Sequence, residues 1–217
     1  MNKEWAELNK TLQSQLKKEN TFEVGVKTVL ELRQQLFDML CGFKMELSRE
    51  DFNSSPYSND EGYHSKTIAY SIWHIFRIED IVAHTLIDHS EQILLTDNYV
   101  TRINTPIITT GNELDGKQIT DFSEALNLDE LYQYITSVMN STNKIISKLS
   151  FADLKRKMSD VDKQHLQQLN VVSTDEKAYW LIDYWCGKDV RELIQMPLTR
   201  HWIMHIEASL RIRNRIK

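Results

Sequence analysis

Apolar residues recur every three or four positions over most of this 217-residue chain, which is the spacing of amphipathic helices. The pattern predicts a short helix at about 3–18 and four long helices at about 21–47, 66–88, 129–149 and 197–217. The first long helix shows the repeat clearly, and its apolar positions are Val26, Leu30, Phe37, Leu40 and Phe43. The chain is therefore predicted to be mainly helical.

The connections between these helices hold most of the turn-forming residues. Residues 48–65 are rich in Ser, Asn and Asp, which predicts a loop, and Ser65 is placed to cap the second long helix. Asn127 or Asp129 is placed to open the third. Two further short helices are expected before the last one, at 151–158 and, after the capping pattern Ser-Thr-Asp-Glu, at about 173–187.

Residues 91–127 form an insertion that is too long and irregular for a plain connector. The segment 99–110, YVTRINTPIITT, has a strand-like composition, and Gly111 and Gly116 mark turns. An insertion of this kind is either a lid or binding loop, or a structural wrap around the helices. Both interpretations stay open.

Composition narrows the class of protein. Six glycines and three prolines are few for this length, so we expect an all-α fold with residues 1–217 in a single domain. A net charge of −5 gives no field that attracts nucleic acid or anionic membranes. The two cysteines lack a metal-binding spacing, and no apolar run suits a signal peptide or membrane span, so we expect a soluble, cytoplasmic protein.

Two histidines of the last helix, His201 and His205, lie one helical turn apart in RHWIMHIEASLRIR. Residues four apart share a face, so both rings can reach one ion. That face also carries Leu198, Ala208 and Ile212, which indicates that it points inward. Such a pair either binds a metal or packs in the core, and a metal site needs a third ligand.

His74 is the best third candidate, because it alone lies inside a long helix at the edge of the apolar stripe, near Ile78. A histidine at such a border also suits simple packing. His84 projects to the charged side of the same helix, with Arg77 and Asp80. The other histidines follow the helix end or lie in expected loops: His89, His64 and His165. Three acidic residues near the candidates project away from them and are expected to be solvated: Glu79, Asp80 and Glu207.

The segments SIWHIFRIEDIVAH (71–84) and HWIMHIEASLRIR (201–213) together resemble the DinB-like family. The resemblance implies a four-helix bundle whose metal ligands are one histidine of the second helix and an H-x-x-x-H pair of the last. Those positions are His74, His201 and His205 here. The insertion at 91–127 would then separate the second and third bundle helices.

Three neutral histidines leave a coordination position open for water or a thiolate, as in catalytic sites. Activities in the family include transfer reactions of low-molecular-weight thiols such as bacillithiol and mycothiol. The resemblance therefore implies a small-molecule enzyme, either a thiol-dependent S-transferase or a hydrolase. Zinc or nickel is the expected divalent ion, with iron or manganese as alternatives. The competing hypothesis is a non-catalytic helical interaction protein in which a metal is structural or absent.

Aromatic and apolar residues supply two further expectations. The cluster Tyr179, Trp180, Tyr184 and Trp185 either lines a pocket or fills the core, and helical spacing favours the core. The last helix is apolar around most of its circumference near the histidines, which favours a homodimer. The residues concerned are Trp202, Ile203, Met204 and Ile206. No phosphate loop, nucleophile elbow or HExxH motif occurs.

Overall fold

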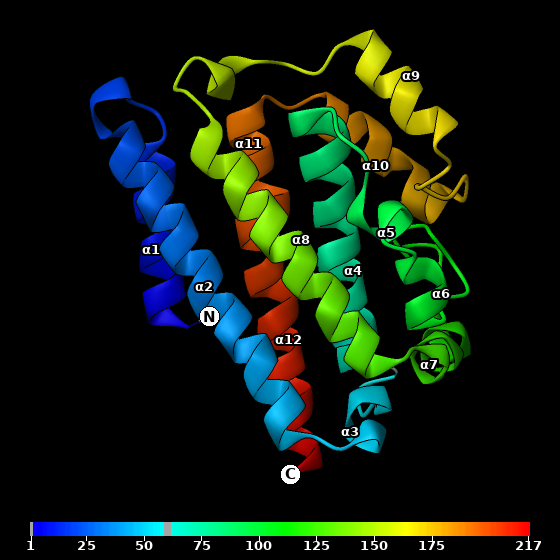
Figure 1. The fold of residues 1–217 in the computed structure, drawn as a ribbon. Helices are drawn as coiled ribbons and strands as arrows, with labels where there is room; N and C mark the ends of the chain where they lie inside the picture. The colour runs from blue at the N-terminus through cyan, green and yellow to red at the C-terminus, as the bar shows by residue number, and fades with distance from the viewer. Residues whose placement is uncertain (1, 59–61) are drawn as a thin grey trace.

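The computed structural model describes residues 2–58 and 62–217, and within these the protein is all-α, without a β-strand. Four long helices dominate: α2 (Phe22–Glu46), α4 (Ile68–Asp80), α8 (Leu128–Lys148) and α12 (His201–Ile216). They lie side by side, with α4 in contact with both α8 and α12, and α2 in contact with α12 (Figure 1). The predicted helical class and the four long helices are confirmed.

Shorter helices surround these four. α1 (Lys3–Gln15) packs along the outer side of α2. The insertion forms α5 (Ile93–Thr96), α6 (Tyr99–Ile103) and α7 (Gly116–Ala125), beside α4 and α8. α9 (Asp160–Gln168) and α10 (Glu176–Cys186) lie together across one end of the long helices (Figure 1). The remaining short helices are α3 (Arg49–Asn53) and α11 (Val190–Gln195), with 3-10 turns at Glu19–Thr21, Gly62–Ser65 and Asp153–Lys155.

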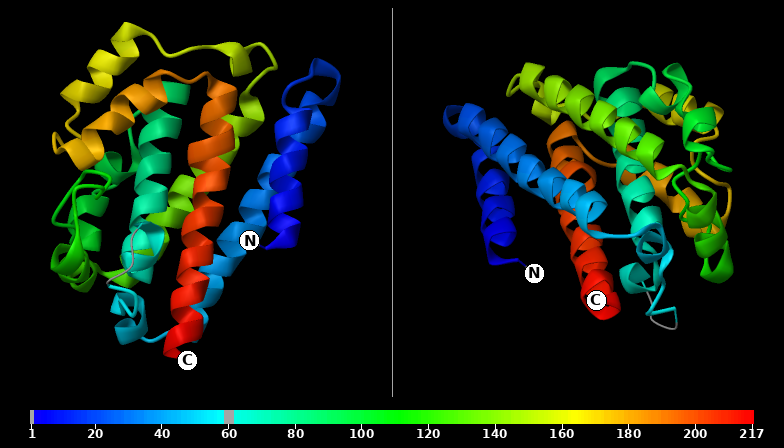
Figure 2. Two further views of the ribbon diagram at one scale, coloured as in Figure 1. Left: turned by 180° about the vertical axis from the view of Figure 1, so that it is seen from behind. Right: turned by 60° about the horizontal axis from the view of Figure 1, so that its bottom comes forward.

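Two of the long helices contain π-helical segments. α4 continues through Ile81–Asp88 in the wider π geometry, and a second π segment, Met196–Arg200, joins α11 to α12. The chain from Val190 to Ile216 is thus helical throughout, and the helix is wider in the π segment just before His201. Figure 2 shows the resulting long element running beside α4 on the rear face of the molecule.

The helix boundaries agree with the sequence in part. Asn127 caps α8 as expected, since its side chain accepts hydrogen bonds from the first backbone N–H groups of that helix. Ser65 does not cap α4; Thr67 does, accepting from the N–H of Tyr70 at 3.0 Å. Residues 48–65 contain α3 in addition to loop, and the part at 59–61 lies outside the described residues. Of the short helix expected at 151–158, only the 3-10 turn at Asp153–Lys155 forms.

The strand-like composition of 99–110 does not produce a strand. Tyr99–Ile103 forms α6, because Tyr99 and Ile103 bury their side chains against α8. The Tyr99 hydroxyl lies 2.9 Å from that of Ser137 on α8, which fixes the contact. No described strand lies alongside to complete a ladder, so β-branched composition alone does not decide this segment.

The charged face predicted on the second helix is also wrong: it is buried. Glu79 and Asp80 are both 0% exposed, and Arg77 and His84 are buried with them. Asp80 is fully used, since Arg77, His84, the Tyr134 hydroxyl and two backbone N–H groups of the insertion all lie within hydrogen-bond or ion-pair distance. The insertion supplies partners that helical projection of α4 cannot show. Pairing of this kind offsets the free-energy cost of burying charged side chains.

The apolar positions of α12 are covered by the chain itself. Trp202, Ile203 and Ile206 are buried against α2 and α4 within one copy. The homodimer was predicted because these residues were expected to need a second subunit to cover them. They do not, so the homodimer stays a prediction that these residues do not support. Among the described residues, no helix is both long and apolar enough to cross a bilayer.

Candidate metal centre

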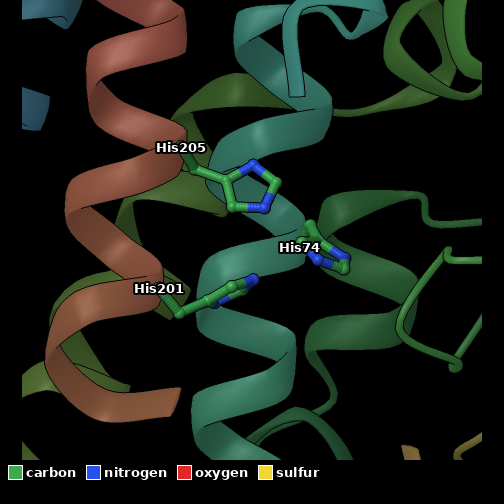
Figure 3. A group of neighbouring side chains, drawn as sticks. All are labelled: His74, His201 and His205. Atoms are coloured by element: carbon green, nitrogen blue, oxygen red, sulfur yellow. The ribbon is translucent and has the colours of Figure 1, made fainter. Parts of the chain in front are cut away.

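The three histidines chosen from the sequence meet between two helices. His74 lies in the middle of α4, His201 is the first residue of α12, and His205 follows one turn later. All three are buried, and each offers one nitrogen within 4.8 Å of the others. The ring centroids are 5.0 Å (His74–His201), 4.7 Å (His74–His205) and 4.6 Å (His201–His205) apart. Figure 3 shows the rings turned toward one another across the gap between α4 and α12.

The spacing is compatible with one shared ion. Nitrogens that bind a tetrahedral zinc at about 2.0–2.1 Å lie roughly 3.4 Å apart. The nitrogens here, all within 4.8 Å of one another, reach that spacing with modest side-chain rotation. The group could therefore hold a divalent metal ion.

His74 is held in place by the insertion. Its Nδ1–H donates to the backbone carbonyl of Thr110 at 2.7 Å, and because a carbonyl only accepts, this fixes the proton on Nδ1. Nε2 then carries the lone pair available to a metal. A second partner that orients the ligand ring in this manner is typical of histidine metal sites.

Tyr70 supports the same arrangement from one turn earlier on α4. Its ring stacks on His74 with centroids 5.5 Å apart and 11° between the planes. Its hydroxyl donates to the Gly111 carbonyl at 2.8 Å. Gly111 has φ +79°, a conformation that favours glycine, and a Cβ there would make a tight 3.1 Å contact with the Tyr70 ring. The insertion thus wraps the helices and also positions a candidate ligand.

Burial keeps the three rings uncharged. Desolvation lowers the pKa of His74 to about 4, against the opposing effect of the Thr110 carbonyl. Burial likewise lowers the pKa values of His201 and His205 well below the usual range, and the neighbouring histidines add to the effect. Neutral imidazole is the form that binds metal. The buried Nδ1 of His201 has no hydrogen-bond partner among the described residues, which costs about 1–3 kcal/mol unless a ligand satisfies it.

A buried ion pair sets the start of α12. Arg33 of α2 makes two 2.7 Å contacts with Glu79 of α4. The same guanidinium donates to the Leu198 carbonyl at 2.8 Å, inside the π segment that precedes His201, and lies over the Trp202 ring at 4.7 Å. Arg33 thereby ties α2, α4 and the π segment together next to the histidines. Nothing in the sequence marks Arg33, because its partners come from distant parts of the chain.

A cavity of about 200 Å³ adjoins the histidines, and His74 and His201 form part of its wall. Asn112 of the insertion is a third polar lining residue. The remaining walls are apolar or aromatic and come mainly from α10 and the π segment: Ile78, Trp180, Leu181, Tyr184, Trp185, Met196 and Pro197. His205 does not line the cavity.

The expectation that the aromatic cluster fills the core is therefore only partly right. Trp185 is 1% exposed and belongs to the core, but Trp180 is 51% exposed and lines the cavity with Tyr184. Tyr179 is turned outward, where its hydroxyl accepts from Gln167. The reason is the position of α10 across the end of the long helices, where only one of its faces meets the core.

The other histidines stay apart from this group. His84 is buried between Asp80 and Ser141. His89 ends the π segment of α4 near Arg156 and Asp162. His165 lies in helix α9 rather than in a loop and is exposed. The backbone of His64 belongs to the 3-10 turn Gly62–Ser65, and its side chain lies outside the described part.

Comparison with known proteins leaves the site to be interpreted from its own geometry. No protein-family model matches the sequence, and no curated protein matches it at a significant level.

Proposed function

We propose that this protein is a metal-dependent enzyme with a DinB-like four-helix bundle formed by α2, α4, α8 and α12. His74, His201 and His205 bind the divalent ion. The observation that carries the proposal is the meeting of three buried, uncharged histidines from two helices, one of them oriented by a backbone carbonyl. One continuous cluster of buried apolar residues runs from Trp5 to Ile212, which supports a single domain over 1–217.

Catalysis is favoured over a purely structural metal because the site adjoins a cavity. Structural zinc sites close their coordination sphere with four protein ligands, whereas catalytic sites keep a position for substrate or water. Here three histidines converge, and two of them face the cavity. A bound metal would supply Lewis acidity to water or to a small thiol at that position. We propose a thiol-dependent S-transferase or a hydrolase, with zinc or nickel as the ion and iron or manganese as alternatives.

Metal content tests the site. Purified protein should contain close to one equivalent of metal by plasma mass spectrometry, and His74→Ala should lose most of it because one of the three ligands is removed. His165→Ala is the matched control, since that histidine is exposed and distant from the group. Circular dichroism confirms that both variants fold. Protein free of metal after growth with added zinc and nickel contradicts the proposal and favours the non-catalytic alternative.

Activity separates the two reaction types. The metal-loaded protein is screened for addition of small thiols to electrophiles and for ester and amide hydrolysis, with His74→Ala as the blank. Turnover that is lost in His74→Ala supports an enzyme and names its class. A loaded protein that turns over neither set supports a metal that only braces the helices.

A further inference from the structure

We propose that the cavity beside His74 and His201 binds a neutral, largely apolar molecule the size of one substituted aromatic ring, with a polar end directed at the histidines. This deepens the proposed function, on which it rests for the contact between the polar end and the metal. The fit of the apolar body to the cavity stands on the cavity walls alone.

The composition of the walls carries the first step. None of the lining residues, all of which lie in the described part of the chain, is Asp, Glu, Lys or Arg. The polar lining residues His74, His201 and Asn112 come from α4, α12 and the insertion, while α10 and the π segment present aromatic and aliphatic side chains. A few convergent polar groups in an apolar wall are typical of small-molecule sites, and they orient the ligand.

The absence of lining charges also selects against ionic ligands. A carboxylate or ammonium that leaves water for this cavity loses its hydration, and no lining side chain of opposite charge compensates for that loss. A neutral ring loses little hydration and gains contact with Trp180, Tyr184 and Trp185. The expected ligand is therefore uncharged over the part that lies against the aromatic wall, away from the histidines.

The volume sets the size. An engineered apolar cavity of about 150 Å³ is known to bind benzene. The cavity here measures about 200 Å³, which leaves room for one ring and a short substituent.

The aromatic wall is held in shape by contacts of its own. The Trp180 indole N–H donates to the Lys177 carbonyl at 2.9 Å, and its ring meets Tyr184 edge to face at 5.5 Å. Lys188 in turn lies 4.2 Å from the Tyr184 ring centroid, on the same helix end. Trp180 is thus fixed although it is half exposed, so a ligand need not order it on binding.

Three probes of equal ring size test the proposal on the full-length protein: benzyl alcohol, benzylammonium and benzenesulfonate. Titration calorimetry at neutral pH, after a chelator has removed any metal whose charge would attract the sulfonate, should show benzyl alcohol binding at least tenfold more tightly than either ion. Trp180→Ala should weaken benzyl alcohol at least fivefold, because it removes an aromatic wall from an exposed position without disturbing the core. Tyr179→Ala, the adjacent exposed aromatic that does not line the cavity, should leave binding unchanged.

A second variant fills the space rather than opening it. Met196→Trp should abolish benzyl alcohol binding while circular dichroism and metal content stay at the parent level. Tighter binding of benzylammonium, through attraction between a cation and the aromatic rings, would overturn the proposal, as would equal binding to Trp180→Ala and the parent.

Metal analysis of the same preparations separates the two proposals. Metal-free protein that still prefers benzyl alcohol, with the loss in Trp180→Ala, rejects the metal centre and keeps the cavity assignment. A preparation that contains metal as purified, but shows no preference for the neutral probe after chelation, rejects the cavity assignment and keeps the metal centre.

Discussion

Two buried histidines on the same long helical element, His74 and His84, differ in almost everything except their burial. His74 faces α12, and burial lowers its pKa to about 4. His84 faces α8, where burial alone would lower its pKa, but the hydrogen bond and charge of Asp80 outweigh it and raise that pKa. The neutral ring of His74 keeps a lone pair that could bind a metal ion, whereas His84 is held by an ion pair with Asp80. A buried histidine is thus understood only through its partners.

The surroundings of each histidine extend the same contrast. Around His84, polar atoms satisfy one another: Arg77 donates to the Ile108 carbonyl and to Gln92, and Tyr134 donates to Asp80. Around His74, the Thr110 carbonyl accepts a hydrogen bond from one ring nitrogen, and the other ring nitrogen faces two more histidines. The polar groups around His84 stabilise the fold by pairing with one another, whereas His74 keeps a ring nitrogen that could bind a metal ion.

The largest effect is expected from Asp80→Asn. The change removes the charge that pairs with Arg77 and His84 in a fully buried setting, and breaking such a pair costs about 3–5 kcal/mol. Urea unfolding measures the loss. Asp121→Asn, at an exposed ion pair on α7, should change the free energy of unfolding by less than about 0.5 kcal/mol. Equal losses in the two variants would show that the His84 region is not the stabilising one.

Acid should weaken the metal-free protein through the His74 region. The folded pKa of His74, about 4, lies below its ordinary value of 6.5, so the unfolded chain binds the proton more readily. The stability this neutral ring contributes is present above pH 6.5 and is lost as the pH falls toward 4, by about 3 kcal/mol. Urea unfolding at a series of pH values, with a chelator present, measures the slope. His74→Gln should be shallower, and an unchanged slope contradicts the assignment.

Metal removal should lower stability by a somewhat smaller amount. A ligand present at a hundred times its dissociation constant stabilises the folded state by about 2.7 kcal/mol. A chelator should therefore lower the melting temperature of the parent but not that of His74→Ala, as measured by calorimetry. His84→Gln should keep the chelator response, because His84 is not a ligand. A chelator shift that vanishes in His84→Gln instead would reverse the comparison.

The smallest effect is expected from Tyr70→Phe. It removes the hydrogen bond to the Gly111 carbonyl, worth about 1 kcal/mol, and loosens the segment that holds His74. Metal affinity should fall by about tenfold, the lower end of the effect for residues that support a metal ligand, because Tyr70 acts on His74 only through ring stacking and the segment at Gly111. Competition with a chromophoric chelator measures the affinity, and Tyr179→Phe at the surface serves as the control.

The long helices and the three candidate histidines could be predicted from local periodicity, and the resemblance to the DinB-like family singled these three out as one group. The spacing of His201 and His205 and the position of His74 at the border of an apolar stripe are properties of single helices. What failed depends on contacts between distant segments. Glu79 is buried because Arg33 reaches it from α2, and Asp80 because the insertion closes over it. Trp180 lines a cavity because α10 crosses the helix ends.

The π segment at Met196–Arg200 lets α11 and α12 face different neighbours. A π turn holds one residue more than an α turn, so it offsets α11 from α12 by about 100° around the axis. α11 can then pack toward α1 while α12 aims both histidines at α4, although the two share one unbroken helical rod. Deleting a single residue there would restore an ordinary α-helix and turn either α11 away from α1 or the two histidines away from α4. The π segment therefore sets the rotational alignment between α11 and α12.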